Sequence, residues 1–307
     1  MRLTDVRKWL GRVHLRDAGG SVLSSFVPVA ALVSHTTGSP VLVSAASSGW
    51  TPLRLEVAES LWGDGCHLPG GADEMLRLAA PLGLSAASSL LLLGAGGGGP
   101  AVRLAGELGV WVCACESDPV LAAAAARRVQ RAGVAMVKRA TVQAWNPAAP
   151  AFRRASFHHA MVIEALHGAG GEGVLAAVAA SLRPGGQLVV LETVATPELN
   201  RANPALRAWC RLECREQPRP GAAWLTDALE RLGFEIRVSE DITGRHIRQA
   251  VGGWKRLVRE MRAERPPPQR AAALVAEAEL WLRRIALLRS GQLRLMRWHA
   301  IGPGTAT

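Results

Sequence analysis

The chain has 307 residues, of which 49% are hydrophobic and 20% are charged, so it can bury a substantial core in one large domain or two. Every apolar stretch is interrupted before the ~18 residues that a membrane-spanning helix needs. The basic N-terminal stretch lacks a small-residue cleavage site, so a signal peptide is not expected. The formal net charge is +11, but lysine runs, RGG-type repeats and tyrosines are absent, which gives a nucleic-acid-binding role little support.

Most of the positive charge lies in residues 201–307, which carry 20 basic and 11 acidic side chains. A solvated, arginine-rich helix surface explains such a balance. An anionic substrate, a membrane surface or RNA near this region is the alternative.

The cysteines predict free thiols. An odd number without a secretion signal favours a reducing compartment, so we expect a cytoplasmic protein with no structural metal site. The five cysteines are Cys66, Cys113, Cys115, Cys210 and Cys214.

Residues 1–49 show no clear periodicity, although 4–16 allow a short basic amphipathic helix, and we treat them as an N-terminal extension without an assigned function. A helix is expected over 52–61. It leads into a Gly- and Pro-dense loop at 62–71, which contains Trp62, Asp64 and His67. Such a loop is either a surface connection or a binding loop.

An apolar run over 89–93 ends in glycines at 94–99, and a helical pattern follows at 101–108. This order predicts a strand, a tight turn and a helix, because glycine allows a positive φ and a close ligand approach. A helix N-terminus also attracts anionic groups. We therefore expect a nucleotide-like ligand across 94–99. The spacing fits both GxGxxG and GxGxG, so the loop alone does not choose between a dinucleotide and S-adenosylmethionine.

The rest of the chain alternates between apolar strands and helices. Strands are expected over 110–115, 140–145, 159–163, 187–192, 235–239 and 293–301. Helices are expected over 72–80, 119–131, 172–182, 204–213, 222–232, 245–262 and 270–289.

This alternation predicts an α/β fold: a doubly wound, mostly parallel, seven-stranded Rossmann-like sheet with helices on both faces. Further helices are inserted around the sixth strand, and we call this group the helical cap. Its tryptophans should pack the interior of the cap: Trp209, Trp224, Trp254 and Trp281. We divide the chain into the extension 1–49, a core at 50–240, and a cap with the final strand at 241–307. Ligands of such sheets bind at the carboxyl ends of the strands.

Glu116 ends the second expected strand about 20 residues after the glycines, where a carboxylate can accept hydrogen bonds from both ribose hydroxyls of a nucleotide. The alternative is an exposed acid at a helix start. With this residue the chain resembles the class I S-adenosylmethionine-dependent methyltransferases over roughly 50–240. The resemblance rests on the segments 91–98 (LLLGAGGG), 115–119 (CESDP), 157–167 (FHHAMVIEALH), 182–188 (LRPGGQL) and 232–234 (LGF).

The resemblance implies S-adenosylmethionine as the cofactor. The glycine turn would line its methionine and ribose parts, Glu116 would bind the ribose, Ser117 would flank the adenine, and Glu164 to His167 would line the place where cofactor and acceptor meet. Asn146 stands where many relatives carry an aspartate that faces the adenine amine, and Leu92 replaces the family's usual acid. The implied cofactor residues are Gly94, Ala95, Gly96, Gly98, Glu116, Ser117, Asn146 and Glu164.

The loop at 62–71 and the segment 240–243 are similar to the branch that acts on small amines, phosphoethanolamine, glycine derivatives, quinones or lipids. The expected function is methyl transfer to a nitrogen, oxygen or carbon atom of a small-molecule or lipid-like acceptor. His167 and Glu164 are the candidate catalytic residues, with Asp64 and His67 from the substrate loop and Trp62 beside them. A positioning role is open for His167.

Two alternatives stay open. One is a cofactor-binding protein of this fold that does not catalyse. The other is an RNA methyltransferase that uses the basic last third. The sequence gives neither the acceptor nor the oligomeric state.

Overall fold

The computed structural model describes residues 49–167, 170–218, 221–261 and 266–304. The N-terminal extension, with its expected basic helix over 4–16, lies outside these residues apart from residue 49. Among the described residues, no helix combines the length and the apolar character that crossing a membrane requires.

The described part of the chain forms one seven-stranded sheet in the order β3-β2-β1-β4-β5-β7-β6. The strands are β1 (Ser89–Leu93), β2 (Trp111–Glu116), β3 (Ala140–Ala144), β4 (Phe157–Ile163), β5 (Leu182–Ala195), β6 (Glu235–Asp241) and β7 (Leu293–Ile301). Neighbouring strands from β3 to β5 run parallel, and β7 is antiparallel to both β5 and β6. The predicted fold class is confirmed.

Strand order reverses between β1 and β4, because the chain first proceeds outward through β2 and β3 and then returns to the other side of β1. In sheets of this kind the ligand crevice lies outside the carboxyl ends of the strands at this switch.

Helices cover both faces of the sheet because its central strands are apolar on both sides. The helices that flank the sheet are α3 (Gly71–Ala79), α4 (Gly99–Leu108), α5 (Pro119–Arg131), α6 (Val134–Arg139), α7 (Gly171–Ser181) and α9 (Ala223–Arg231), with a 3-10 turn at Ala80–Leu82. Leu90 and Leu92 pack with α3, α4 and α5 on one face, whereas Leu91 and Leu93 pack with α7 and α9 on the other.

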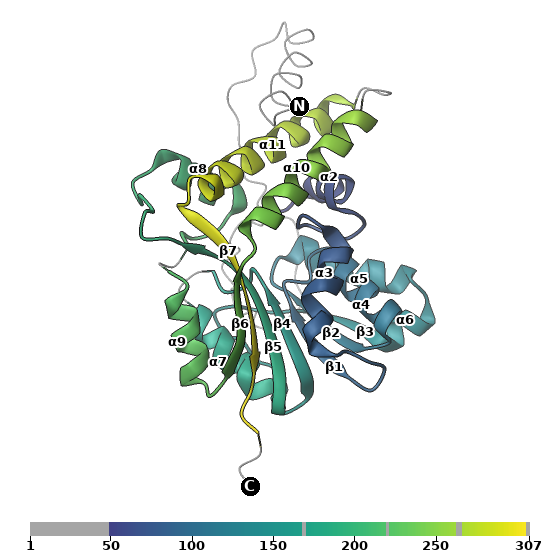
Figure 1. Cartoon of the computed structure of the whole chain (residues 1–307). Coiled ribbons are helices and arrows are strands. Elements are labelled where there is room, and N and C mark those ends of the chain that lie inside the picture. Colours follow the sequence, from purple (N-terminus) through teal and green to yellow (C-terminus); the bar gives the residue numbers. More distant parts are fainter. Residues whose placement is uncertain (1–48, 168–169, 219–220, 262–265, 305–307) are drawn as a thin grey trace, which may run out of the picture.

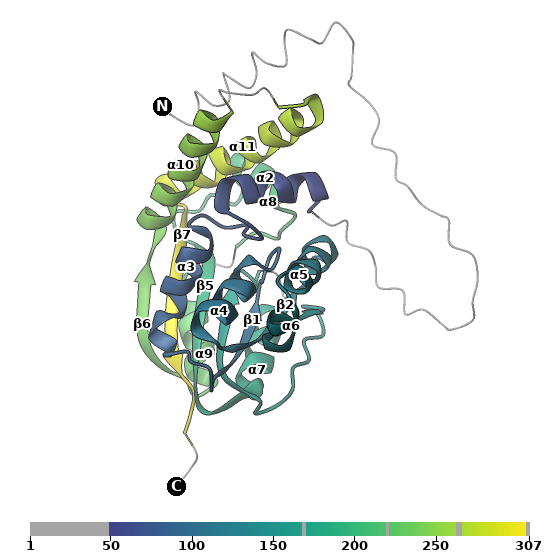
Figure 2. The same cartoon turned by 90° about the vertical axis from the view of Figure 1, so that its right-hand side faces the viewer.

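A helical cap lies over one end of the sheet (Figures 1 and 2). It consists of α2 (Pro52–Trp62), α8 (Pro204–Glu213), α10 (Thr243–Glu260) and α11 (Pro268–Arg289). Trp209, Trp254 and Trp281 fill its interior, as expected. The expectation for Trp224 is wrong, because this residue starts α9 and packs against the sheet face that α7 and α9 cover. The cap also takes in α2 and α8, which precede residue 241.

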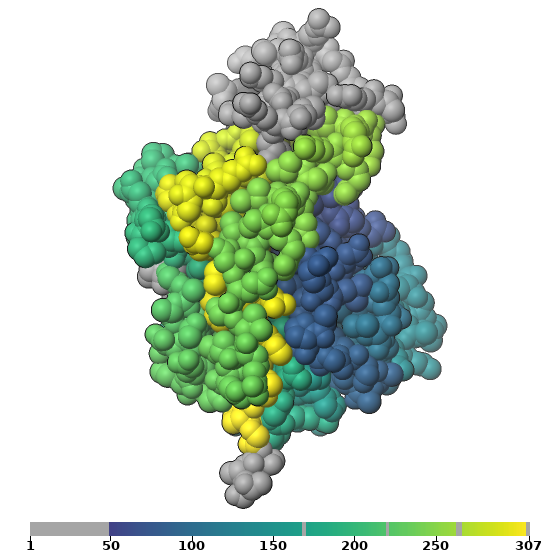
Figure 3. Space-filling model, viewed as in Figure 1, coloured from purple at the N-terminus to yellow at the C-terminus, as the bar shows by residue number. Residues whose placement is uncertain are grey.

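A buried carboxylate ties the cap to the core. Glu74 on α3 accepts hydrogen bonds from Arg245 Nε (3.0 Å) and Gln249 Nε2 (2.7 Å) on α10. The space-filling view shows α10 in light green lying along the blue surface of α3 (Figure 3). The cap therefore rests on the sheet domain through polar contacts as well as through apolar packing.

Candidate functional site

A cavity of about 350 Å³ opens between the cap and the carboxyl ends of the strands. Gly94 follows β1, Glu116 ends β2 and Glu164 follows β4, and all three line the cavity. Trp281 and Arg284 of α11 line it from the cap. It thus lies at the switch in strand order, where the topology predicts a ligand.

The glycine turn has the backbone that its composition predicts, with φ values of +77° at Gly94, +59° at Gly96 and +88° at Gly98. A Cβ at Gly94 would lie 2.1 Å from the carbonyl oxygen of Ile163, and one at Gly96 would lie 2.1 Å from Nδ1 of His67. Both positions therefore require glycine.

Only part of this turn reaches the cavity. Gly94 lines it, whereas Ala95 is fully buried in the core. Gly96 and Gly98 are not among the lining residues, and Gly98 packs against Ala125 of α5. The N–H of Gly99, at the start of α4, donates to the carbonyl oxygen of Gly65 (3.1 Å), so the loop at 62–71 already satisfies it.

Glu116 is 5% exposed, so the alternative of an exposed acid at a helix start is wrong. Its carboxylate accepts three backbone N–H bonds, from Gly96 (2.8 Å), Ser117 (2.8 Å) and Asp118 (3.1 Å). Burial nevertheless raises the pKa of this carboxyl to about 7, because the three bonds offset only part of the lost hydration. Ser117 lies beside it in the cavity wall.

Asn146 does not line the cavity, although the next residue, Pro147, does. The Asn146 side chain is exposed, and its Oδ1 accepts the N–H of Ala148 (3.0 Å) in a local turn. Asn146 thus forms the kind of turn that asparagine favours next to proline.

The loop at 62–71 separates two cavities. His67 lines the cavity at the strand ends, whereas Trp62 and Asp64 line a second one of about 850 Å³ on its other side, between α10 and the helices α4 and α5. The structure therefore does not bring these three residues together. The Nδ1 atom of His67 is buried without a hydrogen-bond partner, and burial lowers the pKa of the ring to about 4. The imidazole is neutral at pH 7.

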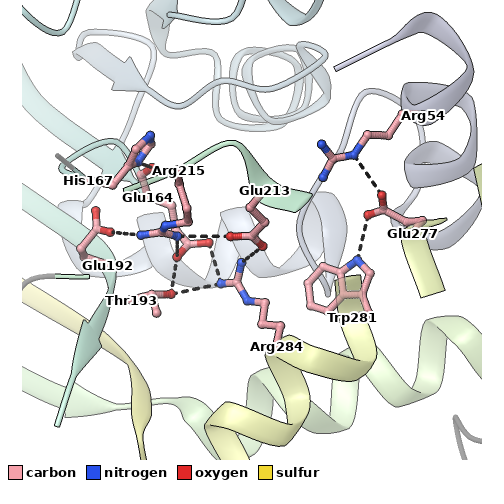
Figure 4. Close-up of polar contacts among 10 residues, drawn as sticks. All are labelled: Arg54, Glu164, His167, Glu192, Thr193, Glu213, Arg215, Glu277, Trp281 and Arg284. Atoms are coloured by element: carbon pink, nitrogen blue, oxygen red, sulfur yellow. Dashed lines mark hydrogen bonds and ion pairs between the residues drawn. The ribbon is translucent and has the colours of Figure 1, made fainter. Parts of the chain in front are cut away.

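A network of buried charges forms the part of the cavity wall near the ends of β4 and β5 (Figure 4). Glu164 has a φ of +48°, a conformation that non-glycine residues seldom adopt, and its side chain points into this network. It accepts hydrogen bonds from Arg284 (2.6 Å) and from the hydroxyl of Thr193, and Arg215 lies 3.5 Å away. Burial alone would raise the pKa of Glu164, but Arg284 and Arg215 hold it well below its usual range.

Both arginines hold further carboxylates. Arg284 also binds Glu213 (2.8 Å), and Arg215 contacts Glu213 (3.4 Å) and Glu192 (3.2 Å). Glu192 lies on β5 and is itself buried. Burial, together with the charge of Glu164, raises its pKa to about 7, although Arg215 opposes this shift.

His167 and Glu277 lie at the edges of this network. Nδ1 of His167 donates to the carbonyl oxygen of Glu164 (2.9 Å), and the ring is exposed beside the cavity. Glu277 accepts hydrogen bonds from Arg54 Nε (3.0 Å) and Trp281 Nε1 (2.9 Å). Glu277 thus joins α2 to α11 within the wall.

Sequence reasoning did not predict the partners of Glu164 in this network or the other ion-pair residues. They come from α2, from β5, from the end of α8 and the segment just after it, and from α11, and no motif spacing connects the residues on the helices with the strand ends. Arg283 and Arg284 are adjacent, yet only Arg284 points into the wall, while Arg283 pairs with Glu279 on the helix surface. The residues concerned are Arg54, Glu192, Thr193, Glu213, Arg215, Glu277 and Arg284.

No group of three or more His, Cys, Asp or Glu side chains suited to a metal ion occurs within the described ranges. All five cysteines have free thiols.

Solved structures with this architecture include several methyltransferases. Haemonchus contortus phosphoethanolamine N-methyltransferase 2, in complex with S-adenosyl-L-methionine, superposes with a TM-score of 0.72 at 18% identity over 85% of this chain and 59% of its own. Geranyl diphosphate C-methyltransferase from Streptomyces coelicolor A3(2), in complex with S-adenosyl-L-homocysteine, superposes at 0.59 with 14% identity over 82% and 99%. The 4+2 cyclase SpnF superposes at 0.60 with 19% identity over 82% and 93%.

These likenesses establish the fold: the chain has the architecture of class I S-adenosylmethionine-dependent methyltransferases. It spans less than two thirds of the Haemonchus enzyme's length. The cyclase has the same architecture, so the fold is not confined to proteins named as methyltransferases. No protein-family profile matches the chain, and no curated protein sequence is detectably similar to it.

Proposed function

We propose that the protein is an S-adenosylmethionine-dependent methyltransferase that acts on a small-molecule or lipid-like acceptor. One observation carries the proposal: Glu116, a buried carboxylate at the end of β2, faces a cavity at the switch in strand order. Two methyltransferases of this architecture were solved with the cofactor or its demethylated product.

The residues in the cavity fit such a cofactor. A volume of about 350 Å³ falls within the range of small-molecule sites. Glu116 would accept hydrogen bonds from the ribose hydroxyls, and Ser117, Leu121 and Pro147 would surround the base. The unpartnered Nδ1 of His67 lies beside the glycine turn.

Two departures from the family pattern shape this fit. Leu92 is fully buried in the sheet core, so no acid supports the glycine turn from that position. The side chain of Asn146 is engaged in its own turn. Recognition of the cofactor would therefore depend on Glu116 more heavily than in relatives that have these acids.

When bound, the cofactor would supply an electrophilic methyl group. The protein would hold the acceptor in line with that group and exclude water. Glu164 is a poor proton acceptor, because its carboxylate is committed to Arg284 and Arg215. His67 and His167 are the better candidates in the wall. Desolvation by the surrounding protein atoms lowers the pKa of the His167 ring, and the charge of Arg215 lowers it further.

Calorimetric titration with S-adenosylmethionine tests the proposal. We expect the wild-type protein to bind, and Glu116→Gln to bind at least ~10-fold more weakly, because hydrogen bonds to a charged group are strong. Glu107→Gln is the control, since Glu107 forms a surface ion pair with Arg103 outside the cavity. No binding by the wild-type protein would refute the proposal.

Incubation with methyl-labelled cofactor and cell extract, followed by separation into small molecules, lipids and RNA, then identifies the acceptor class. Label in the small-molecule or lipid fraction is expected. Label in RNA alone would support the RNA methyltransferase instead, and binding without any transfer would support a non-catalytic protein. A cytoplasmic location stays a prediction.

A further inference from the structure

The charge of the cavity wall is opposite in sign to that of the whole chain. The chain carries a net +11. The described residues that line the cavity include three arginines and five carboxylates, a formal charge of −2. These residues are Arg54, Arg215, Arg284, Glu116, Asp118, Glu164, Glu213 and Glu277. The excess comes from Glu116 and Asp118 beside the end of β2, and elsewhere in the described wall three arginines face three glutamates, so no positive charge is in excess there.

Each arginine in this wall is paired with a carboxylate of the protein. The Arg284 side chain is 2% exposed and binds Glu164 and Glu213. The Arg215 side chain is 5% exposed and has three carboxylates within 3.5 Å. Arg54 holds Glu277 and also donates to the carbonyl oxygen of Gly49 (2.6 Å). In the described wall, therefore, two of the three nitrogens of each guanidinium are already engaged, and none offers a ligand two free donor nitrogens for a pair of parallel hydrogen bonds.

This pairing has a direct consequence for recognition. Proteins bind phosphate and carboxylate groups with arginines whose planar donor forks are free to form two parallel hydrogen bonds. An acidic acceptor in this cavity would have to displace a buried internal partner, which would leave that carboxylate buried and unpaired. An amine has no such cost, because the carboxylates of the wall can accept its N–H groups.

We call the part of the cavity that the ion pairs line, near the ends of β4 and β5, its acceptor half. We propose, on the basis of the function proposed above, that this half selects an amine that bears no phosphate or carboxylate group. This reverses the sequence-based suggestion of an anionic substrate near the basic last third. Two arginines from that third, Arg215 and Arg284, neutralise internal carboxylates.

Matched pairs of acceptors test this selectivity. Ethanolamine is compared with phosphoethanolamine, and benzylamine with 4-(aminomethyl)benzoate, each with the protein saturated with S-adenosylhomocysteine. We expect the acid-free member of each pair to raise the melting temperature at ~10-fold lower concentration than its acidic partner, because only the latter must disrupt an ion pair. Inorganic phosphate should have no effect beyond that of sodium chloride at equal ionic strength.

The outcomes separate the two proposals. If the protein binds S-adenosylhomocysteine but prefers the acidic members, or binds no amine at all, the selectivity is refuted and the cofactor proposal stands. If it binds neither S-adenosylmethionine nor S-adenosylhomocysteine, the proposed function itself fails.

A variant supplies a second test. Glu277→Gln keeps an oxygen for Trp281 Nε1 but leaves Arg54 without its charged partner. We expect this variant to bind phosphoethanolamine roughly 10-fold more tightly than the wild type does, because the Arg54 guanidinium then has no carboxylate partner in the cavity wall. Glu107→Gln, in a surface pair, should leave both members of each acceptor pair unchanged. If Glu277→Gln is folded and gains no affinity for phosphoethanolamine, the role of pairing is refuted.

Discussion

At the ends of β1 and β2 the cavity wall consists of backbone groups and the carboxylates of Glu116 and Asp118, whereas at the ends of β4 and β5 it consists of side-chain ion pairs. In the first half, Gly96 and Glu116 are 20 residues apart and form a direct hydrogen bond. In the second half, Glu164 binds Arg284 across 120 residues of sequence. The first half depends on local turn geometry, and the second depends on the docking of the cap.

From this difference we expect the free energy of unfolding to be more sensitive to the loss of a single side chain in the second half than in the first. Arg284→Met should lower the free energy of unfolding by roughly 3–5 kcal/mol, because Glu164 and Glu213 would be left buried without that charge. Urea denaturation followed by circular dichroism measures the change. Arg283→Met, one residue earlier in a half-buried pair with Glu279, is the matched control and should cost only about 1 kcal/mol. Equal effects of the two variants would contradict the buried network.

In the first half, the cost in stability of a left-handed backbone conformation can be separated from the cost of a close side-chain contact. Gly96→Ala should destabilise the fold by roughly 2–3 kcal/mol, since it places a Cβ against His67 in a left-handed conformation. Gly83→Ala has nearly the same φ (+58°) but nothing within 4 Å of the new Cβ, so it should cost only about 1 kcal/mol. Thermal unfolding measures both. The contact argument fails if the two variants are equally stable.

The pKa of Glu116 predicts a pH dependence confined to the first half. Because burial raises this pKa to about 7, the carboxyl is partly protonated at neutral pH, whereas ribose hydroxyls bind the ionised form better. The affinity for S-adenosylmethionine should therefore rise between pH 6 and pH 8, by up to ~10-fold per unit below the pKa, and level off above it. Titrations at several pH values measure this, and Glu116→Gln should abolish the dependence. A flat wild-type profile would argue against Glu116 as the ribose ligand.

The smallest effect is expected at Asn146. Its side chain is exposed and engaged in a local turn, so Asn146→Ala should change stability by less than ~0.5 kcal/mol. The cofactor affinity should change less than about twofold, within the range of surface substitutions. A large loss of affinity would show that this loop rearranges to meet the adenine.

The sequence predicted what local physical chemistry determines. Apolar strands, a glycine-saturated turn and an acid at the end of β2 led to the sheet and to Glu116. The sheet is confirmed, and Glu116 lines a cavity at the strand ends, while its role as a cofactor ligand stays a prediction. Family analogy placed Asn146 at the adenine, but the residue's own preference for a turn takes it away from the cavity wall.

The sequence could not indicate which of many arginines would be buried. Arg283 and Arg284 occupy equivalent positions in a charged helix pattern, and only the packing of α11 on α2 and α8 decides which one faces inward. The loop at 62–71 illustrates the same limit, because its turns direct His67 to one cavity and Trp62 and Asp64 to another.

The insertion of β7 between β5 and β6 also constrains the order of folding during synthesis. β6 pairs with β7 alone among the described strands, so residues 235–241 lack a sheet partner until residues 293–301 have left the ribosome. The cap helices α10 and α11 lie between these two strands in the sequence. Arg284 belongs to α11, so its ion pair with Glu164 also forms only after this segment has been synthesised. Such late, long-range closure slows folding. The sheet edge, the cap and the acceptor half of the cavity should therefore be completed together, as one late event.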